Sequence, residues 1–416
     1  MKIRLPRTTS YDLTLILVVL ALTLVGVAMV YSASGIRALD TLDDPRYYLT
    51  WQSLWAALGL VGMFVVMRID YHRYRIIAVP LLVVVVAMLA LTLVPGVGAC
   101  AGGACRWLRL GPAGIQPSEL AKLALVIYLA AWLGARRDAV GSMGVLVPFL
   151  AVTAAVAGLV VAEPDLGTAI VIVAIAMTMY FLAGARLKVF AALAGLAAVS
   201  VLAIAIEQPY RLRRLTTFID PWADPQGAGF QTIQSLYGLA LGGVFGEGLG
   251  AGREKFGFLP APYTDSIFAV LGDELGLAGT LSVIVLFFVL GYRGIGIALR
   301  ARDATGALLA AGITTWLIFQ AWVNMAVVAS LVPMTGITLP FISYGGSSLC
   351  VGLIAVGILL NVGREAGPAP ASVSRAPRRR RDGRPHQPAP RDRRGGARDR
   401  SRGAAPVHRW SSRARG

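Results

Sequence analysis

The sequence predicts an all-α polytopic membrane protein with about ten transmembrane helices and a large extracytoplasmic loop between spans 7 and 8. Of the 416 residues, 56% are hydrophobic and only 15% are charged, whereas soluble domains have about 45–50% apolar and about 25% charged residues. The mean hydropathy is +0.68. Apolar stretches of roughly 20 residues, the length that crosses a bilayer, recur along the whole chain.

The ten expected spans alternate with connections of contrasting charge. Their apolar length places them at about residues 12–31, 50–67, 76–94, 118–134, 145–162, 167–183, 189–206, 266–292, 307–332 and 344–362. Every second connection carries Lys or Arg, whereas residues 40–45 on the opposite side are acidic. The positive-inside rule therefore predicts a multi-pass plasma-membrane protein with both termini in the cytoplasm. A cleaved signal peptide is not expected, because no small-residue cleavage site follows the first span.

Three regions follow from this pattern. Residues 1–11 form a cytoplasmic N-terminus, residues 12–362 the ten-span domain with its long external loop 207–265, and residues 363–416 a tail. From Arg364 to Gly416 the tail has sixteen Arg, no Lys and four acids, and so carries +12 of the net charge of +17. This composition predicts disorder. We expect the tail to contact anionic membrane lipids and no nucleic acid; a specific protein or nucleic-acid contact is the alternative.

The cysteines and histidines do not predict a metal site. Cys350 lies within an apolar span, and the three histidines are scattered, two of them in the tail. Cys100 and Cys105, in CAGGAC, form a disulfide if their loop faces an oxidising compartment, or remain two free thiols. The sequence leaves both states open.

The first two external stretches contain acids beside expected helix starts. In QPSELAK, Glu119 and Lys122 are three residues apart and can pair on one helical face. The pair is either a structural ion pair or a charged pair that lines a polar cavity. In EPDLGTA, Glu163 and Asp165 can bind a divalent cation, orient a basic partner or cap the next helix, and capping by Asp165 is the default.

The long loop combines basic residues with glycine-rich turns, a combination that suits an anionic head group such as pyrophosphate. An interfacial loop that touches lipid phosphates would look similar. Gln231, Gln234 and Ser235 fall on one helical face, and the glycines of GGVFGEGLGAG permit close approach to a ligand. The candidate substrate-binding residues of the loop are Arg213, Arg214, Gln231, Ser235 and Lys255.

Asp265 ends the long loop and begins the eighth span. At an N-cap its carboxylate would accept a backbone N–H, and plain capping is the simplest interpretation. A partly desolvated carboxylate at the mouth of a cavity can instead act as a general base. Of Asp273 and Glu274, at most one is expected to share that cavity. Residues 324–349 contain Pro and Gly that interrupt a regular helix, so they predict a polar external cavity, with Ser343 as a further candidate.

Five motifs stand in the order seen in one known family. They are QPSELAK, EPDLGTA, FIDPWADPQGAGFQTIQS, LPAPYTDSIFAV and PMTGITLPFISYGGSS. On these motifs, about residues 10–363 resemble the SEDS family (shape, elongation, division and sporulation), whose members are polytopic peptidoglycan glycosyltransferases. MVYSAS, RLRRLTTFIDPW and GLGAGREKFGFLP resemble the division-type branch, FtsW, more than the elongation-type branch, RodA.

The resemblance implies that the protein polymerises lipid II at the outer face during division and releases undecaprenyl pyrophosphate with inversion. It maps the family's key aspartate onto Asp265, which would take the proton from the acceptor sugar's 4-hydroxyl. It maps the family's polar-cavity pair onto Glu119 and Lys122, and its acidic turn onto Asp165. The implied partners are a class B penicillin-binding protein, a transpeptidase, and other division proteins. The family usually has LPEAHTDFIFA where this chain has Ala261, Pro262, Tyr263 and Ser266, so the role of the missing acid and histidine is open.

Other interpretations use the same residues. A lipid II flippase would use the cavity to move the head group, and an elongation-type polymerase would share the chemistry. A structural scaffold is less favoured, because it does not require acids and basic clusters on one face. The sequence identifies no certain cofactor. A divalent cation, Mg²⁺ or Mn²⁺, that bridges the pyrophosphate is an open alternative, and no protein ligand set for it is evident.

Overall fold

The computed structural model describes residues 11–101, 104–110, 113–252, 259–260 and 262–365. These residues belong to one compact unit, Met1–Pro370. The predicted cytoplasmic N-terminus, apart from Tyr11, and the Arg-rich tail after Glu365 lie outside the described residues.

Each of the ten expected spans corresponds to a helix. Nine of these helices are long and apolar enough to cross a membrane, and the remaining one, α6, is apolar with 17 residues. The ten are α1 (Leu13–Leu42), α2 (Tyr47–Val66), α3 (Tyr74–Thr92), α4 (Pro117–Gly134), α5 (Met143–Ala162), α6 (Leu166–Leu182), α7 (Leu187–Glu207), α10 (Ile267–Arg300), α11 (Ala304–Val328) and α12 (Gly346–Glu365). Helices α1 and α10 extend 11 and 8 residues beyond their predicted ends.

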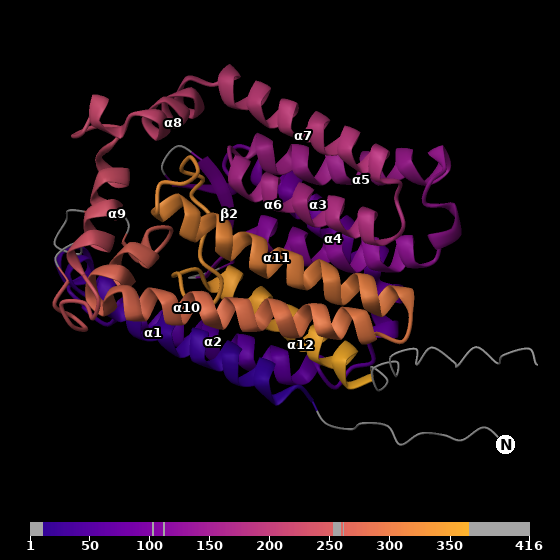
Figure 1. The fold of residues 1–416 in the computed structure, drawn as a ribbon, viewed down its shortest axis with the longest axis horizontal. Coiled ribbons are helices and arrows are strands. Elements are labelled where there is room, and N and C mark those ends of the chain that lie inside the picture. Colours follow the sequence, from indigo (N-terminus) through magenta and orange to yellow (C-terminus); the bar gives the residue numbers. More distant parts are fainter. Residues whose placement is uncertain (1–10, 102–103, 111–112, 253–258, 261, 366–416) are drawn as a thin grey trace, which may run out of the picture. The chain divides into compact units, whose positions relative to one another are not determined.

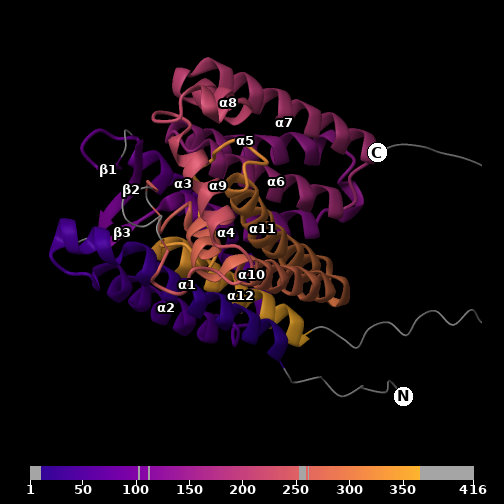
Figure 2. The ribbon, with the colours of Figure 1, turned by 60° about the vertical axis from the view of Figure 1, so that its left-hand side comes forward.

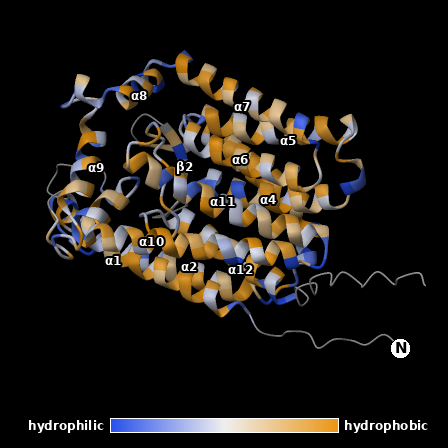
Figure 3. Ribbon diagram, viewed as in Figure 1, coloured by the Kyte–Doolittle hydropathy of each residue, from blue (hydrophilic) through white to orange (hydrophobic). Residues whose placement is uncertain are grey.

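The helices pack as a bundle around α4, α11 and α12, whose residues are the most buried (Figure 1). Small residues allow close contact: a Cβ on Gly357 of α12 would lie 2.6 Å from the carbonyl oxygen of Met63 in α2. Such contacts are typical of helices that associate in membranes, where packing rather than the hydrophobic effect holds them together. Apolar residues dominate the helices, and polar residues gather where the helices end (Figure 3).

The two ends of the bundle are distinct. At one end, here called the Glu365 end, Arg293 binds Asp12 at 2.6 Å and Arg364 donates to the Tyr11 hydroxyl at 2.7 Å. Helix α1 therefore begins where α12 ends, as an even number of crossings requires. The other end, here called the Asp265 end, holds the start of α10 and the start of α12.

The all-α prediction needs one correction at the Asp265 end. Residues that were expected to form a loop make a three-stranded antiparallel sheet of β1 (Gly98–Ala101), β2 (Ala104–Leu110) and β3 (Ala113–Ile115) (Figure 2). The strands are too short to show a period of two in the sequence, and their glycines disfavour strand structure. The sheet joins α3 to α4 and contacts both helices.

The long external loop also contains regular structure. It includes the helices α8 (Pro209–Ile219) and α9 (Phe230–Leu241), and α9 packs against α10. The glycine-rich segment after α9 lies against a kink in α10 at Gly276, where φ is +65°. Glu247 N–H donates to the Asp273 carbonyl and Gly248 N–H to the Glu274 carbonyl, both at 3.0 Å. These glycines therefore approach a neighbouring helix; that they also permit close approach to a ligand stays a prediction.

Candidate active site

Asp265 lies beside the start of α10 but does not cap it, so the simplest prediction for this residue is wrong. Helix α10 begins at Ile267, and Ser266 is its N-cap residue. The Asp265 carboxylate turns instead toward α9: it accepts from the Thr264 hydroxyl at 3.1 Å and from the Gln231 amide at 3.4 Å. Gln231 also donates to the Ser266 hydroxyl at 3.0 Å. The carboxylate is thus oriented by side chains and remains partly exposed.

Opposing effects act on the Asp265 carboxyl. Burial raises its pKa above the ordinary value, because desolvation disfavours the charged form. Hydrogen bonds from Thr264, its own backbone N–H and Gln231 lower the pKa, as does the positive charge of Arg214. The net effect is a raised pKa, which makes the carboxylate a stronger base than a solvated aspartate.

The backbone of Asp265 is also fixed. Asn324 in α11 donates to the Asp265 carbonyl at 2.8 Å and to the Ile337 carbonyl at 2.7 Å. Asn324 is buried, so its amide joins α11, the segment after α11 and the start of α10 without competition from water.

A cavity of about 380 Å³ adjoins this group between α8, α9 and the segment after α11. Its polar side includes Arg213, Arg214 and Gln231, and its apolar side includes Phe218 and Met334. Because Gln231 lines the cavity and bonds the Asp265 carboxylate, the carboxylate lies one side chain away from it. The cavity brings together three of the predicted site residues.

The two arginines of the cavity have different partners. Arg213 pairs with Asp224 at 2.7 Å, with both side chains about half exposed. Hydrogen bonds from Ala228 N–H and from Arg213 lower the pKa of Asp224. Arg214 donates to the Met334 carbonyl at 3.4 Å. An exposed pair of this kind contributes little stability, so Arg213 can exchange Asp224 for an anion at small cost.

Glu119 and Lys122 form the predicted pair, at 2.8 Å, and both side chains are buried. Lys122 also donates to Gln320 of α11 at 2.7 Å, and Gln320 in turn donates to the Thr338 carbonyl at 3.0 Å. Both side chains are buried, and neither lines the cavity beside Asp265. This position fits a structural ion pair better than a pair that lines a cavity. Whether the pair touches substrate stays a prediction.

Asp165 caps α6, as the default interpretation predicted. Its carboxylate accepts from the Thr168 N–H at 3.1 Å and from the Thr168 hydroxyl at 2.9 Å. Glu163, two residues earlier, is fully buried and accepts a short hydrogen bond from the Thr92 hydroxyl. Burial, more than any other effect, raises the pKa of Glu163 to about 7.

Two predicted substrate contacts are used inside the protein. Ser235 is buried and donates to the Gln231 carbonyl at 2.8 Å, within α9. The Ser343 hydroxyl accepts from Leu339 N–H at 2.8 Å and so closes the turn before α12. Neither lines the cavity. Lys255 lies outside the described residues. Asp273 and Glu274 are both buried behind the kink of α10 and do not line the cavity either.

Several contacts of the site were not predicted. Gln320 and Asn324 are four residues apart in an apolar helix, and that spacing of intramembrane amides could have indicated a polar interface. Tyr263 packs against Tyr48 with ring centroids 4.6 Å apart, and its carbonyl accepts from Tyr344 N–H at 2.8 Å. Burial raises the pKa of Tyr263, so its phenol stays neutral and supports the turn before Asp265.

Comparison with known proteins assigns the chain to a family. The sequence model of the FtsW/RodA/SpoVE family, described as cell cycle protein, matches residues 12–367. The chain belongs to the FtsW/RodA/SpoVE family. The matched residues include every helix and strand described above, so the family fold accounts for the whole bundle.

Relatives within the family share most of their length with this chain. It is 43% identical over 359 residues to stage V sporulation protein E of Bacillus subtilis, covering 86% of this chain and 98% of that protein. It is 44% identical over 358 residues to a probable peptidoglycan glycosyltransferase FtsW of Trichlorobacter lovleyi, with 86% and 94% covered. A chain of a solved peptidoglycan synthase complex, which coordinates polymerisation and crosslinking, superposes with a TM-score of 0.70 at 34% identity, with 85% and 98% covered.

Proposed function

We propose that this protein is a peptidoglycan glycosyltransferase of the division type that polymerises lipid II into glycan strands. The observation that carries the proposal is an oriented, partly exposed carboxylate, Asp265, one side chain from a cavity lined by Arg213 and Arg214. Relatives named as probable peptidoglycan glycosyltransferases FtsW support the same activity. The sporulation relative supports the chemistry without distinguishing division from sporulation.

In the proposed reaction Asp265 is the general base. The acceptor's 4-hydroxyl oxygen attacks the anomeric carbon of the donor and loses its proton to the Asp265 carboxylate. The new C–O bond forms as the bond from the anomeric carbon to the pyrophosphate oxygen breaks, and its electron pair leaves with undecaprenyl pyrophosphate. Thr264 and Gln231 hold the carboxylate in one orientation, and general-base assistance is typically worth about 10²–10⁴-fold.

The arginines of the cavity suit the leaving group. Guanidinium groups bind phosphate oxygens in a bidentate manner and remain charged at all physiological pH values. Arg213 and Arg214 would therefore stabilise the negative charge that develops on the pyrophosphate. Lys255 remains a candidate for the same role.

A divalent cation would have to be held largely by the substrate. Among the described residues, the cluster of three potential metal ligands is Asp70, His72 and Glu365. Glu365 is the last residue of α12, and the first turn of that helix, near the site, is about 30 Å away. The cavity presents arginines rather than a set of carboxylates. If Mg²⁺ or Mn²⁺ takes part, it would neutralise the pyrophosphate.

The proposal includes a location and partners. The protein would act in the plasma membrane at the division septum, with its Asp265 end outside the cytoplasm and both termini inside. A class B penicillin-binding protein would crosslink the strands that it makes, and other division proteins would assemble with the pair. The structural match to a chain of a peptidoglycan synthase complex supports a transpeptidase partner.

The test uses the purified full-length protein with its transpeptidase partner and labelled lipid II in liposomes. Wild type should form glycan ladders, and Asp265→Asn should slow polymerisation by about 10²-fold or more. Asp138→Asn, an exposed acid to amide change between α4 and α5, is the matched control. The reaction is repeated with EDTA and then with Mg²⁺ or Mn²⁺ to determine the metal requirement.

The outcomes separate the alternatives. Ladders from Asp265→Asn at the wild-type rate would keep the enzyme and remove Asp265 from the mechanism. No ladders from folded wild type, together with movement of lipid II across the liposome membrane, would favour the flippase.

A further inference from the structure

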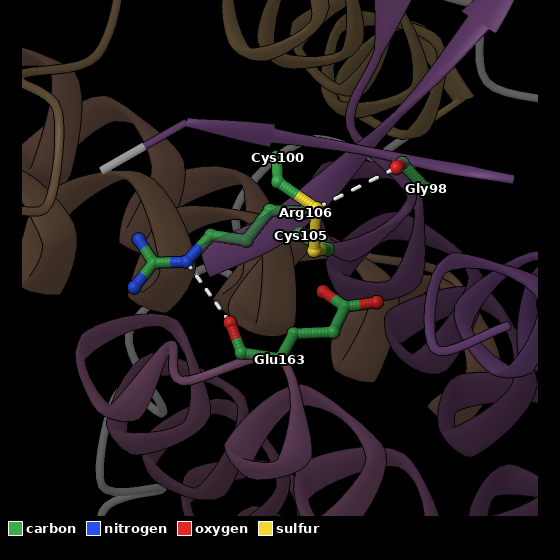
Figure 4. Close-up of a disulfide and its surroundings, with 5 residues drawn as sticks. All are labelled: Gly98, Cys100, Cys105, Arg106 and Glu163. Carbon is green, nitrogen blue, oxygen red and sulfur yellow. Dashed lines mark hydrogen bonds between the residues drawn. A yellow bond between two sulfur atoms is a disulfide. The ribbon is translucent and has the colours of Figure 1, made fainter. Parts of the chain in front are cut away.

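Arg106, in the central strand β2, binds the turn that joins α5 to α6. Its Nε donates to the Glu163 carbonyl at 3.0 Å (Figure 4), and its Nη2 makes a short hydrogen bond to the Pro164 carbonyl. Its Nη1 lies 4.0 Å from the Asp165 carboxylate. The planar guanidinium therefore contacts three consecutive residues of the turn, which a point charge such as lysine could not do.

This turn sets the position of α6. Asp165 caps the helix through Thr168, and Glu163 is buried against Thr92 of α3. The carbonyls that Arg106 binds lie at the C-terminal end of α5, where backbone acceptors lack partners within the helix. Removing Arg106 would leave these acceptors with fewer partners and the turn free to shift.

The start of α6 in turn contacts the segment after α11, which shares Asn324 with Asp265 as a hydrogen-bond partner. A Cβ on Gly167 would lie 2.8 Å from both the Thr335 carbonyl and the Ile337 side chain, so this glycine is in close contact with that segment. The Ile337 carbonyl accepts from Asn324, which also binds the Asp265 carbonyl. Three successive contacts therefore connect the Arg106 turn to the backbone of Asp265.

A disulfide stands directly before Arg106. Cys100 and Cys105 are opposite one another in the pairing of β1 and β2, and their sulfurs are bonded (Figure 4). The bond closes a hairpin whose residues 102–103 lie outside the described part of the chain. The bond links β1 covalently to β2 next to Arg106, so it restricts the strand from which Arg106 extends. On the predicted topology the disulfide faces an oxidising compartment.

We propose that Arg106 is a positioning residue for Asp265 and that the Cys100–Cys105 disulfide holds Arg106 against the α5–α6 turn. The proposal makes the activity of this chain depend on the redox state of the hairpin. A dithiol such as dithiothreitol would open it by exchange: the Cys100–Cys105 bond takes up two electrons and two protons, and the two thiols of the reagent form a disulfide. The effect on polymerisation rests on the function proposed above.

The experiment compares Arg106→Gln and Arg106→Lys with Arg109→Gln in the full-length protein with its partner. Arg109 lies on the same strand and is exposed, so it is the matched control. Cys100→Ser/Cys105→Ser, and wild type before and after dithiothreitol, test the disulfide; the double variant should not respond to the reagent. Two readouts are measured: the polymerisation kinetics, and amide hydrogen exchange of residues 165–169 and 264–266.

Arg106→Gln should lower kcat about tenfold or more, with KM for lipid II within about twofold, because the base is misplaced while the substrate still binds. Arg106→Lys should recover only part of kcat. Exchange at both segments should rise about fivefold or more in Arg106→Gln and in reduced wild type, with α12 unchanged. Arg109→Gln should match wild type.

Equal kinetics and exchange in Arg106→Gln and Arg109→Gln would overturn the positioning role. An increase in exchange across the whole chain, α12 included, would also overturn it, because it would show a loss of general stability. Unchanged exchange in reduced wild type would overturn the role of the disulfide. If wild type forms no glycan, the proposed function fails, and the exchange pattern still decides whether Arg106 and the disulfide hold the two segments.

Discussion

At the scale of single residues, the properties of Asp265 come from neighbours that are distant in sequence. Gln231 is 34 residues away and Asn324 is 59 residues away, yet one binds its carboxylate and the other its carbonyl. The resemblance of LPAPYTDSIFAV to the family's motif singles out the aspartate. It does not indicate which groups orient it or which change its pKa.

Removal of the Gln231 amide should change how the rate depends on pH. This hydrogen bond stabilises the charged form of Asp265, so Gln231→Ala should raise the pKa of the carboxyl. A general base works only when deprotonated, and the rate falls as the pH drops through its pKa. The acid limb of kcat/KM against pH should therefore move to higher pH, and Gln234→Ala, in the same helix, should leave it in place. A limb that does not move would remove Gln231 from the support of the base.

Glu163 should make stability depend on pH in the opposite sense to an ordinary carboxylate. Its pKa is raised from 4.5 to about 7 in the folded protein, so the folded state binds more protons than the unfolded state between these values. Stability is then complete at low pH and decreases as the pH rises through this window. The difference is on the order of 3 kcal/mol.

Glu163→Gln should abolish this dependence. Its thermal midpoint in detergent should vary less between pH 5 and pH 8 than that of wild type, which should decrease toward pH 8. A wild-type midpoint that rises over the same range would contradict the direction of the pKa shift.

At the scale of elements, the lysine of a buried ion pair in α4 also bonds α11. Lys122 bonds Glu119 in its own helix and Gln320 in α11, and its ammonium also lies 5.1 Å from the ring centre of Trp316. The spacing of three residues predicted the first contact. The contacts to α11 depend on the way the two helices pack, which the local pattern does not contain.

Removal of one partner of this pair should be costly. Lys122→Met would leave Glu119 charged and buried, which typically costs about 3–5 kcal/mol. Glu119→Gln/Lys122→Met should be less destabilised than the sum of the single variants, because no unpaired charge remains. Thermal unfolding of the four proteins in detergent measures the coupling, and additive effects would show that the two residues act independently.

At the scale of the whole molecule, the alternation of basic connections with an acidic one on the opposite side predicts which end faces the cytoplasm. A single cysteine at exposed Trp222 should react with a membrane-impermeant maleimide in intact cells, in a background in which Cys100, Cys105 and Cys350 are replaced by Ser. A cysteine at Asp138 should react only after the membrane is permeabilised. The reverse pattern would invert the predicted orientation and would place Asp265 on the side opposite to its proposed substrate.

The sequence by itself determined the elements that depend on local chemistry. Apolar length defines ten helices, because a segment that is apolar throughout can satisfy its backbone only as a helix in a membrane. Local spacing also accounts for the pairing of Glu119 with Lys122 and for the cap at Asp165. The small sheet and α8 did not have such a signal, since short elements are stabilised by the surfaces against which they pack, whereas the helical face of Gln231, Gln234 and Ser235 did indicate α9.

The tertiary structure alone decided which polar residues meet. It placed Gln231 and Asn324 around Asp265, and it positioned Arg106 on the turn before α6. It also used Ser235 and Ser343, both predicted to bind substrate, for internal hydrogen bonds. The physical reason is that a side chain's role depends on the partners and on the burial that packing provides, and packing joins residues across distances that no local pattern spans.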